Sequence, residues 1–567
     1  MSESKEFTVS EVVDSFGINA NTWLMFVLLG LANIFDGYDF MVVNTTNTYL
    51  AASFGMVHAD PTAPTGYVVD RAAMGSLTTW GLLGMVLGGA CGGIMSDKLG
   101  RKKMLIIACL FYGVFTLPQA FAQSLGFFAA FRLIAGFGVG SCIPVVTTCF
   151  SETIPTAHRG VFVTFGMAFM VAGWVLAGVI GNPIASNPVS MFGGFTGTEI
   201  TLATGATACE NWRVCYLIGA LPIIYGIVLI FAMRETPHWY ANNGQMDKAV
   251  EALAKLEKAA TGKVTDRDPN ALVVPPKPAK TSVNVLFSKK FIVGTAAIWT
   301  CYFVGQFCVY GMNAWIPTWF QGVGYTPAQS VTLQTWNNVA AIASNVTVGF
   351  VSDRIGRKKN LCLSWILCIV AIILCSVFIV NDPEQKKMVL YVVLMLLFGF
   401  CLNYAITAVQ PLMPEQYPTA LRNTGVAWCQ AFARFGGSAS SIVLGFIAGL
   451  AVFQDPATGA PMWSKVVLVL IVPFVLAEIC ALLFCKETGG KTMDELAADG
   501  GGETDTGMVP FVIIMCIAAF LAALCIVCPL AVPGWSAKPY AMPLDLIALL
   551  LPFVFFFIFA GPQALKK

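Results

Sequence analysis

Two short polar segments of this chain repeat each other almost residue for residue, and each one follows a long apolar run. Residues 93–103 read GIMSDKLGRKK and residues 349–359 read GFVSDRIGRKK, in a chain of 567 residues. A repeat on that scale indicates that a membrane-spanning unit has been duplicated, an arrangement found in transporters. The sequence therefore predicts two related halves built from spanning helices.

The composition favours a membrane protein and excludes several other classes. Charged residues make up 11% of the chain and hydrophobic residues 57%, whereas soluble domains carry about 25% charged residues. A net charge of +2 argues against a nucleic-acid partner. The 18 cysteines are scattered through apolar runs without metal-type spacing, so we expect them to be small buried side chains, and we expect no metal or cofactor.

Fourteen stretches are long and apolar enough to cross a bilayer, which needs about 20 residues each. They are 22–47, 72–95, 104–122, 125–149, 160–182, 212–233, 291–320, 328–352, 360–380, 388–412, 424–453, 464–484, 508–530 and 541–561. The predicted fold is an all-α polytopic membrane protein with two six-helix bundles and two extra C-terminal helices. The predicted divisions are a first bundle over 1–233, a cytoplasmic linker over 234–290, a second bundle over 291–484, a tether over 485–507 and a transmembrane hairpin over 508–567.

The distribution of positive charge predicts the orientation. Most of the 33 Lys and Arg residues fall on the side of the N-terminus, and an even number of spans puts the C-terminus on that side too. Because Lys and Arg accumulate in cytoplasmic loops, we expect a multi-pass protein of the cell membrane with both termini in the cytoplasm. The segments predicted outside hold only Arg71, Arg213, Lys386, Lys387, Lys465 and Lys538.

The linker contains one amphipathic segment, Asp247 to Ala260, with its apolar residues on one side. We predict a short helix there. It is either a plain connection or an inner brace that couples the two halves.

The repeated Gly-x-x-x-Asp-x-x-Gly-Arg-Lys loops are similar to the signature of the major facilitator superfamily, as is the glycine pattern after Arg132 (RLIAGFGVG). Further matches over residues 7–496 resemble the branch that contains sugar porters and organic-ion and aromatic-acid symporters. They are Glu152 with Arg159-Gly160, Trp212-Arg213, Arg234 to Pro237 (RETP), Pro414-Glu415 with Arg422, and Glu487 to Lys491 (ETGGK).

Within that branch, two patterns resemble the aromatic-acid/proton symporters. They are Asp36-Gly-Tyr-Asp39 in the first predicted helix and Arg434-Phe-Gly436-Gly437 in the eleventh. The two extra C-terminal helices depart from the twelve-helix pattern of those symporters. The resemblance implies alternating access around a central site.

The repeated loops are candidates for an inner latch between the halves, as the resemblance implies, because a latch needs acids as well as bases. The alternative is that they only set topology. The predicted gating residues are Asp97, Gly100, Arg101, Glu152, Arg159, Asp353, Gly356, Arg357, Glu415 and Arg422.

Asp36 and Asp39 are three residues apart, so they share a face of the first predicted helix. Intramembrane acids are costly, usually face a cavity and often carry protons. We therefore predict that one or both couple transport to protons. The alternative is a structural acid paired with a base on a neighbouring helix.

Arg132 and Arg434 are the basic residues well inside predicted helices. A guanidinium matches a carboxylate with two parallel hydrogen bonds, so both are candidates for binding an acidic substrate. Arg132 could instead pair with an acid of the first helix and never touch substrate.

Polar and aromatic residues on the helices expected to line the central cavity complete the predicted substrate site. Aromatic walls with a few amides suit a small ring-bearing or sugar-like ligand, although each residue alone could equally serve helix packing. They are Trp174, Tyr302, Gln306, Tyr310, Asn313, Asn337, Asn338, Asn403, Tyr404, Gln410, Trp428 and Gln430.

These patterns together predict a secondary active transporter that takes up a small organic acid, aromatic acids included, with protons. A sugar or polyol porter of the same fold and an efflux transporter for amphiphilic compounds are the alternatives. The sequence contains no nucleotide-binding loop, no set of metal ligands and no nucleophile elbow, so we do not expect an enzyme. The expected partners are the lipid bilayer, protons and a small-molecule substrate, and we expect a monomer.

Overall fold

The computed structural model describes residues 6–59, 67–155, 159–202, 207–262, 264–265, 267–274, 283–288, 291–379, 385–417, 419–455, 461–485 and 487. The N-terminal part contains α1 (Val9–Ser15), α2 (Ala20–Ser53), α3 (Arg71–Leu99), α4 (Arg101–Thr116), α5 (Leu125–Thr153), α6 (Arg159–Ala185), α7 (Trp212–Gly219) and α8 (Pro222–Ala232). After α9 (Pro237–Asn242) and α10 (Met246–Thr261) come α11 (Ile292–Val323), α12 (Pro327–Ile355), α13 (Arg357–Phe378), α14 (Met388–Glu415), α15 (Thr419–Gly449), α16 (Trp463–Leu468) and α17 (Ile471–Phe484).

Two predicted spans are each divided into two helices. The span expected over 212–233 breaks between α7 and α8, where Pro222 lacks the N–H that would continue the helix. The span expected over 464–484 breaks between α16 and α17, two residues before Pro473.

Eleven segments of the described chain are long and apolar enough to cross a membrane. The helix α12 is 29 residues long but rich in amide and hydroxyl side chains, and it is not among the eleven. The two C-terminal stretches predicted to span, 508–530 and 541–561, lie outside the described residues. The count of fourteen spans therefore stays a prediction.

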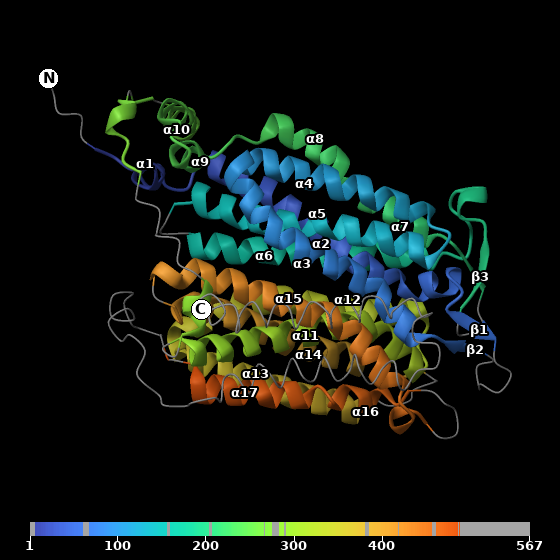
Figure 1. The fold of residues 1–567 in the computed structure, drawn as a ribbon. Helices are drawn as coiled ribbons and strands as arrows, with labels where there is room; N and C mark the ends of the chain where they lie inside the picture. Colours follow the sequence, from blue (N-terminus) through green and yellow to red (C-terminus); the bar gives the residue numbers. More distant parts are fainter. Residues whose placement is uncertain are drawn as a thin grey trace, which may run out of the picture.

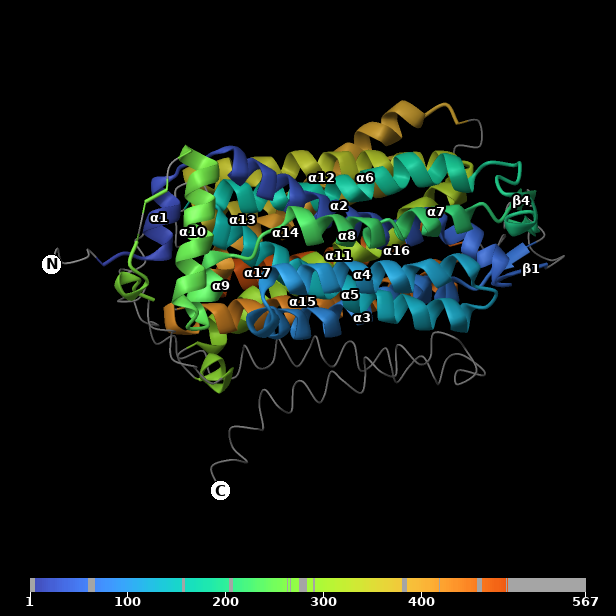
Figure 2. The same cartoon turned by 90° about the horizontal axis from the view of Figure 1, so that it is seen from above.

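The long helices lie side by side along one direction (Figure 1). In this view α2 to α8 gather in the upper part and α11 to α17 in the lower part. We call the end where α1, α9 and α10 lie the linker end, and the opposite end, with the strands, the loop end (Figure 2). Two small antiparallel pairs form at the loop end, β1 (Val57–Ala59) with β2 (Tyr67–Val69) and β3 (Glu199–Thr201) with β4 (Thr207–Cys209).

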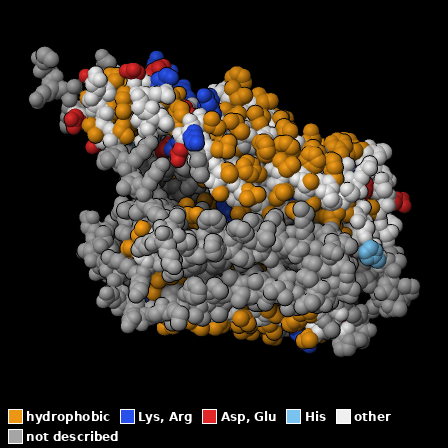
Figure 3. Space-filling model, in the orientation of Figure 1, with side chains coloured by type: hydrophobic (Ala, Val, Ile, Leu, Met, Phe, Trp, Pro, Cys, Tyr) orange, Lys and Arg blue, Asp and Glu red, His pale blue; other side chains and the backbone are white. Residues whose placement is uncertain are grey.

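Apolar side chains cover the outer surface of α4, α7 and α8, whereas charged side chains gather around α1 and α10 (Figure 3). Ile224, Ile227 and Phe231 on α8 are among the exposed apolar residues. An apolar belt with a charged end is what a helix bundle needs in order to sit in a bilayer with one end in water.

The predicted linker helix is present as α10 and covers part of the linker end. Ala249 and Leu253 on α10 pack with Val9 and Val13 of α1 in a small apolar cluster of their own. The hydroxyl of Ser10 lies 3.1 Å from Nε2 of His238 on α9. The described part of the linker thus holds the N-terminal helix, and a brace between the halves remains a prediction.

Glycines set the spacing between α3 and α5. A Cβ on Gly84 would lie 2.1 Å from the carbonyl oxygen of Leu133, and one on Gly88 would lie 1.9 Å from that of Phe137. On the facing helix, a Cβ on Gly140 would lie 2.2 Å from the carbonyl oxygen of Met85. Small residues allow two backbones to approach closely in a membrane, where lipid supplies no hydrophobic force between helices.

The two groups of helices touch each other near the loop end. The amide of Asn182 on α6 donates to the carbonyl of Ala328 on α12 at 2.8 Å. The amide of Gln321 on α11 donates to the Thr48 hydroxyl on α2 at 3.0 Å. The structure is therefore closed between the two groups at this end.

Neighbouring glycines of α3 allow a matched test of the close packing. Gly88→Ala forces a methyl group against the Phe137 carbonyl, and we expect a loss of about 1–3 kcal/mol in stability. Gly89→Ala is the control, because its Cβ would lie 3.6 Å from the nearest atom, the Gly140 carbonyl oxygen. Thermal unfolding of the purified variants measures the difference. Equal midpoints for the two would contradict close α3–α5 packing.

Candidate functional site

Asp39 on α2 is held by α4 and α5. Arg132 donates from Nη1 to the Asp39 carboxylate at 2.9 Å and from Nη2 to the Asp39 carbonyl at 2.6 Å. The hydroxyl of Thr116 donates to the other carboxylate oxygen at 3.1 Å. Asp39 and Arg132 are 2% and 3% exposed. The structure thus has the helix-to-helix pair that was the alternative role for Arg132.

Asp36 lies one turn of α2 away and has a different environment. It is also 2% exposed, but neither carboxyl oxygen has a hydrogen-bond partner among the described residues. Cys142 and Tyr112 flank it, and Arg434 of α15 lies within electrostatic range. A buried acid without a direct counter-charge is costly unless it can bind a proton.

Arg434 faces a polar row on α11. Tyr302, Gln306 and Tyr310 are spaced by four residues, which puts them on one face of that helix. The helix α15 packs against this row, since a Cβ on Gly437, one turn from Arg434, would lie 2.8 Å from Cδ2 of Tyr310. In the part of the chain that the structure describes, no ion pair includes Arg434. Its guanidinium is therefore available to an added anion.

Exposure along α15 changes between its two ends. Gln430, Arg434 and Ser438 share one face of α15, and they are exposed, half-buried and fully buried in that order. Since α15 runs from the linker end to the loop end, the exposure of this face decreases toward the loop end.

Three aromatic rings from both halves meet beside this region. Phe40 on α2 lies 4.7 Å from Tyr310, and Trp174 on α6 lies 5.6 Å from Phe40 and 6.5 Å from Tyr310, measured between ring centroids. Phe40 is one turn of α2 from Asp36. We call Phe40, Trp174 and Tyr310 the aromatic trio.

The other predicted substrate residues have separate surroundings. The Tyr404 hydroxyl donates to Asn360 on α13 at 2.8 Å, and Asn337 packs against Gly399 of α14. The amides of Asn313 and Asn403 donate to carbonyls of their own helices. Asn338 is buried beside Asn337, whereas Trp428 and Gln410 are half-buried. Nothing in these contacts assigns them to substrate, and their role stays a prediction.

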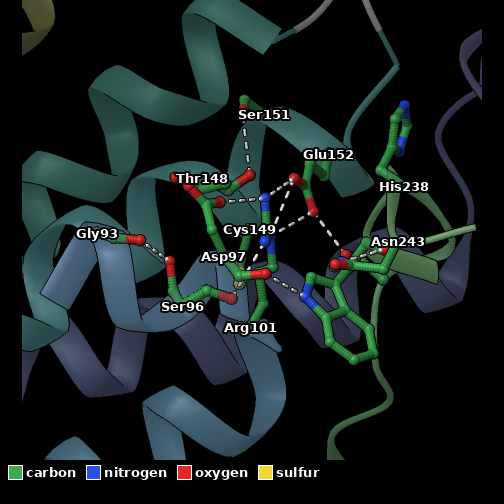
Figure 4. Close-up of polar contacts among 12 residues, drawn as sticks. Gly93, Ser96, Asp97, Arg101, Thr148, Cys149, Ser151, Glu152, His238 and Asn243 are labelled. Atoms are coloured by element: carbon green, nitrogen blue, oxygen red, sulfur yellow. Dashed lines mark hydrogen bonds and ion pairs between the residues drawn. The ribbon is translucent and has the colours of Figure 1, made fainter. Parts of the chain in front are cut away.

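The first repeated loop forms a network at the linker end (Figure 4). Arg101 donates from Nε and Nη2 to Glu152 at 3.1 and 2.9 Å, and Nη2 also lies 3.1 Å from Asp97. Its Nη1 donates to the Ser96 carbonyl at 3.2 Å. Arg101 is 6% exposed, so its guanidinium fastens α3, α4 and the end of α5 to one another.

Glu235, from the RETP segment, completes this network and was not among the predicted site residues. It accepts hydrogen bonds from the backbone N–H groups of Arg101 at 2.9 Å and Lys102 at 3.2 Å. Gly100 precedes α4 with φ of 103° and offers no side chain, so Glu235 supplies the negative charge that a helix N-terminus favours. Burial raises the pKa of the Glu235 carboxyl, against the lowering effect of these N–H groups.

The second repeated loop has the same construction. Arg357 forms an ion pair with Glu415 at the end of α14. Glu487 accepts from the backbone N–H groups of Arg357 at 2.9 Å and Lys358 at 3.3 Å, and Gly356 has φ of 94°. Glu487 therefore corresponds to Glu235. The side chains of Asp353, Arg159 and Arg422 lie outside the description.

The sequence contains a pattern that could have identified Glu235 and Glu487 as the two capping acids. Each is the acid that directly follows the last helix of its half, 134 residues after Arg101 in one case and 130 after Arg357 in the other. Among the described residues, no group of His, Cys, Asp or Glu side chains could hold a metal ion.

Comparison with known sequences points to one class of proteins. Residues 24–499 match the family described as "Sugar (and other) transporter". A gallate transporter of Pseudomonas putida is 28% identical, over 78% of this chain and 89% of its own length. A niacin transporter of Acinetobacter baylyi is 26% identical over 85% and 98%, and a 4-hydroxybenzoate transporter of Pseudomonas aeruginosa is 26% identical over 84% and 95%.

Solved structures with a similar fold include a D-xylose-proton symporter, with a TM-score of 0.61 and 18% identity over 83% of this chain and 99% of that one. A second structure, of the major facilitator superfamily proton:xylose symporter XylE with a bound sugar analogue, has a TM-score of 0.59 and 20% identity, over 85% of this chain and 100% of that one. At such identity the likeness concerns the fold alone.

The Arg101 network generates a testable expectation. Arg101→Lys keeps the charge but loses the planar guanidinium, so the partly buried Glu152 carboxylate keeps fewer hydrogen-bond donors. Hydrogen bonds to charged groups are worth about 1.5–3 kcal/mol, so we expect a clear fall in the thermal unfolding midpoint. Lys103→Ala is the matched control, because Lys103 is exposed in the same loop. A loss of stability in the control alone would contradict the role given to Arg101.

Proposed function

Because the chain belongs to the sugar (and other) transporter family, within the major facilitator superfamily, we propose that it takes up a small organic acid together with protons. The observation that carries this proposal is a half-buried arginine, Arg434, which has no ion-pair partner among the described residues, together with the buried acid Asp36, whose carboxyl oxygens have no hydrogen-bond partner there. The family and the relatives make the chain a membrane transporter rather than an enzyme.

Arg434 is the proposed carboxylate site. Its guanidinium can bind a carboxylate with two hydrogen bonds, and its half-buried position makes that interaction stronger than in bulk water. Tyr302 and Gln306 on the facing row of α11 add neutral hydrogen-bonding groups. A neutral sugar carries no anionic group that could pair with this guanidinium.

Asp36 is the proposed proton carrier. An ionised Asp36 and a substrate carboxylate are two anions near one cation, Arg434, and their repulsion disfavours both being charged. Substrate binding is therefore stronger when Asp36 holds a proton, so the substrate and the proton would be transported together. Asp39 instead keeps α2 in place through its pair with Arg132.

The substrate class follows from the relatives and from the aromatic trio. The relatives' names give gallate, niacin and 4-hydroxybenzoate as their cargo, and all three are aromatic acids. The rings of Phe40, Trp174 and Tyr310 offer faces and edges for an aromatic ligand. We therefore propose an aromatic acid.

Alternating access between two six-helix bundles is the proposed transport cycle. The two repeated loops, each fastened by Arg101 or Arg357, would act as inner latches that form and break as the bundles rock. The described conformation, closed at the loop end, would be open to the cytoplasm at the linker end. This orientation, the cytoplasmic termini, the cell-membrane location, the extra C-terminal hairpin and the monomeric state are part of the same proposal.

The two acids of α2 give opposite expectations. Asp36→Asn should fold and exchange substrate but should not accumulate it against a gradient. Asp39→Asn should mainly lose stability, because breaking a buried pair costs about 3–5 kcal/mol. Uptake of radiolabelled 4-hydroxybenzoate into proteoliposomes with an imposed pH gradient, beside thermal unfolding, separates the two effects. Accumulation by Asp36→Asn equal to wild type would exclude Asp36 as the proton carrier.

Arg434 is tested by comparing an acid with its amide. Arg434→Lys should weaken 4-hydroxybenzoate binding about ten-fold, since the fork is lost, and Arg434→Gln should weaken it further. Binding of 4-hydroxybenzamide should be weak in wild type and unchanged by either substitution. Equal affinity of wild type for both compounds, unaffected by Arg434→Lys, would favour a sugar porter over an acid transporter.

A further inference from the structure

Two buried polar atoms beside the aromatic trio have no partner in the described structure. The indole nitrogen of Trp174 and the amide oxygen Oε1 of Gln306 are both without a hydrogen bond. The two residues are only 3% and 9% exposed. Buried polar atoms without a partner cost free energy and need an explanation.

Both atoms belong to the same side-chain group as Arg434. Trp174 is a member of the aromatic trio, with its ring 6.5 Å from that of Tyr310. Gln306 lies one turn of α11 from Tyr310 on the same face, and it interacts with the Tyr302 hydroxyl. Gly437, one turn of α15 from Arg434, packs against the Tyr310 ring. A ring whose carboxylate binds Arg434 would therefore extend toward the side chains that carry the two unpartnered atoms.

The chemistry of the two atoms selects one substituent. The indole N–H can only donate, and the amide oxygen can only accept. A hydroxyl group accepts one hydrogen bond and donates another, so it satisfies both. An ether or a halogen leaves the Gln306 oxygen without a donor.

We propose that Trp174 and Gln306 form a subsite for a hydroxyl group on the ring of an aromatic acid. The subsite rests on the proposed function, because Arg434 must hold the carboxylate for the ring to lie here. The subsite would favour aromatic acids that carry a ring hydroxyl over those that do not. The names of the relatives do not give this preference for the present chain. A site with unmet polar groups discriminates against a ligand that cannot satisfy them.

The test uses the purified full-length protein and needs no variant for its first reading. Equilibrium binding is measured for benzoate, the three monohydroxybenzoates and the methyl ether of the best of them. We expect at least one hydroxybenzoate to bind about ten-fold or more tightly than benzoate, and the ether to lose that gain. Equal affinities across the series would overturn the subsite.

Two conservative variants then assign the residues. Trp174→Phe keeps a ring and removes the N–H, and Gln306→Leu removes the amide. Each should abolish most of the hydroxyl preference, read as the ratio of hydroxybenzoate affinity to benzoate affinity measured on the same variant. Trp365→Phe is the matched control, because the Trp365 indole N–H is also buried without a partner but packs against Phe474. A preference that survives both site variants contradicts the proposal.

The outcomes separate the subsite from the proposed function. Benzoate binding that depends on Arg434, with no effect of a hydroxyl group, removes only the subsite. Binding of none of the acids, or binding that ignores Arg434→Lys, removes the proposed function and the subsite together.

Discussion

Asp39 and Arg132 form the interaction on which the rest of the central region depends. Two opposite charges inside a membrane protein are tolerable only as a well-bonded pair, and this pair fastens α2 to α5, with Thr116 of α4 completing it. Gly81 leaves the space, since a Cβ there would lie 2.8 Å from Nε of Arg132. With α2 fixed in this way, Asp36 on the same face is left without a direct counter-charge. Asp39 is thus held in an ion pair, whereas the Asp36 carboxyl has no hydrogen-bond partner among the described residues.

The linker end repeats one arrangement in both halves. In each, a glycine with positive φ begins a helix, an arginine pairs with the acid that ends the fourth helix of that half, and a distant glutamate caps the new helix. The first copy also contacts the linker, where Thr236 donates to Glu152 at 2.5 Å and Trp239 donates to the Asp97 carbonyl at 2.9 Å. Neutral hydrogen bonds join the halves at the loop end, whereas charged ones fasten each half internally at the linker end. This difference suits a protein whose halves separate at one end while each stays rigid.

Much of the fold followed from patterns that are local in sequence. Apolar runs of about 20 residues predicted the eleven segments of the described chain that are long and apolar enough to span a membrane, whereas the division into two six-helix bundles stays a prediction. The breaks at Pro222 and before Pro473 were not anticipated, because a hydropathy window averages over them. The helix α12 shows the reverse case, since its position was predicted although its side chains are polar. Polar atoms on a helix are tolerated when neighbouring helices bury them.

The sequence by itself determined the class of protein, the repeat and the short set of intramembrane charges. It could not say which acid pairs with which base, since that depends on helices 93 residues apart in the chain meeting at one level of the bundle. Tertiary structure assigned Arg132 to Asp39, left Asp36 without a hydrogen-bond partner among the described residues, and brought Phe40, Trp174 and Tyr310 together from three helices. It also revealed Glu235 and Glu487 as helix caps. The physical reason is that pairing and capping are satisfied through space, by whichever polar group packing brings within about 3 Å.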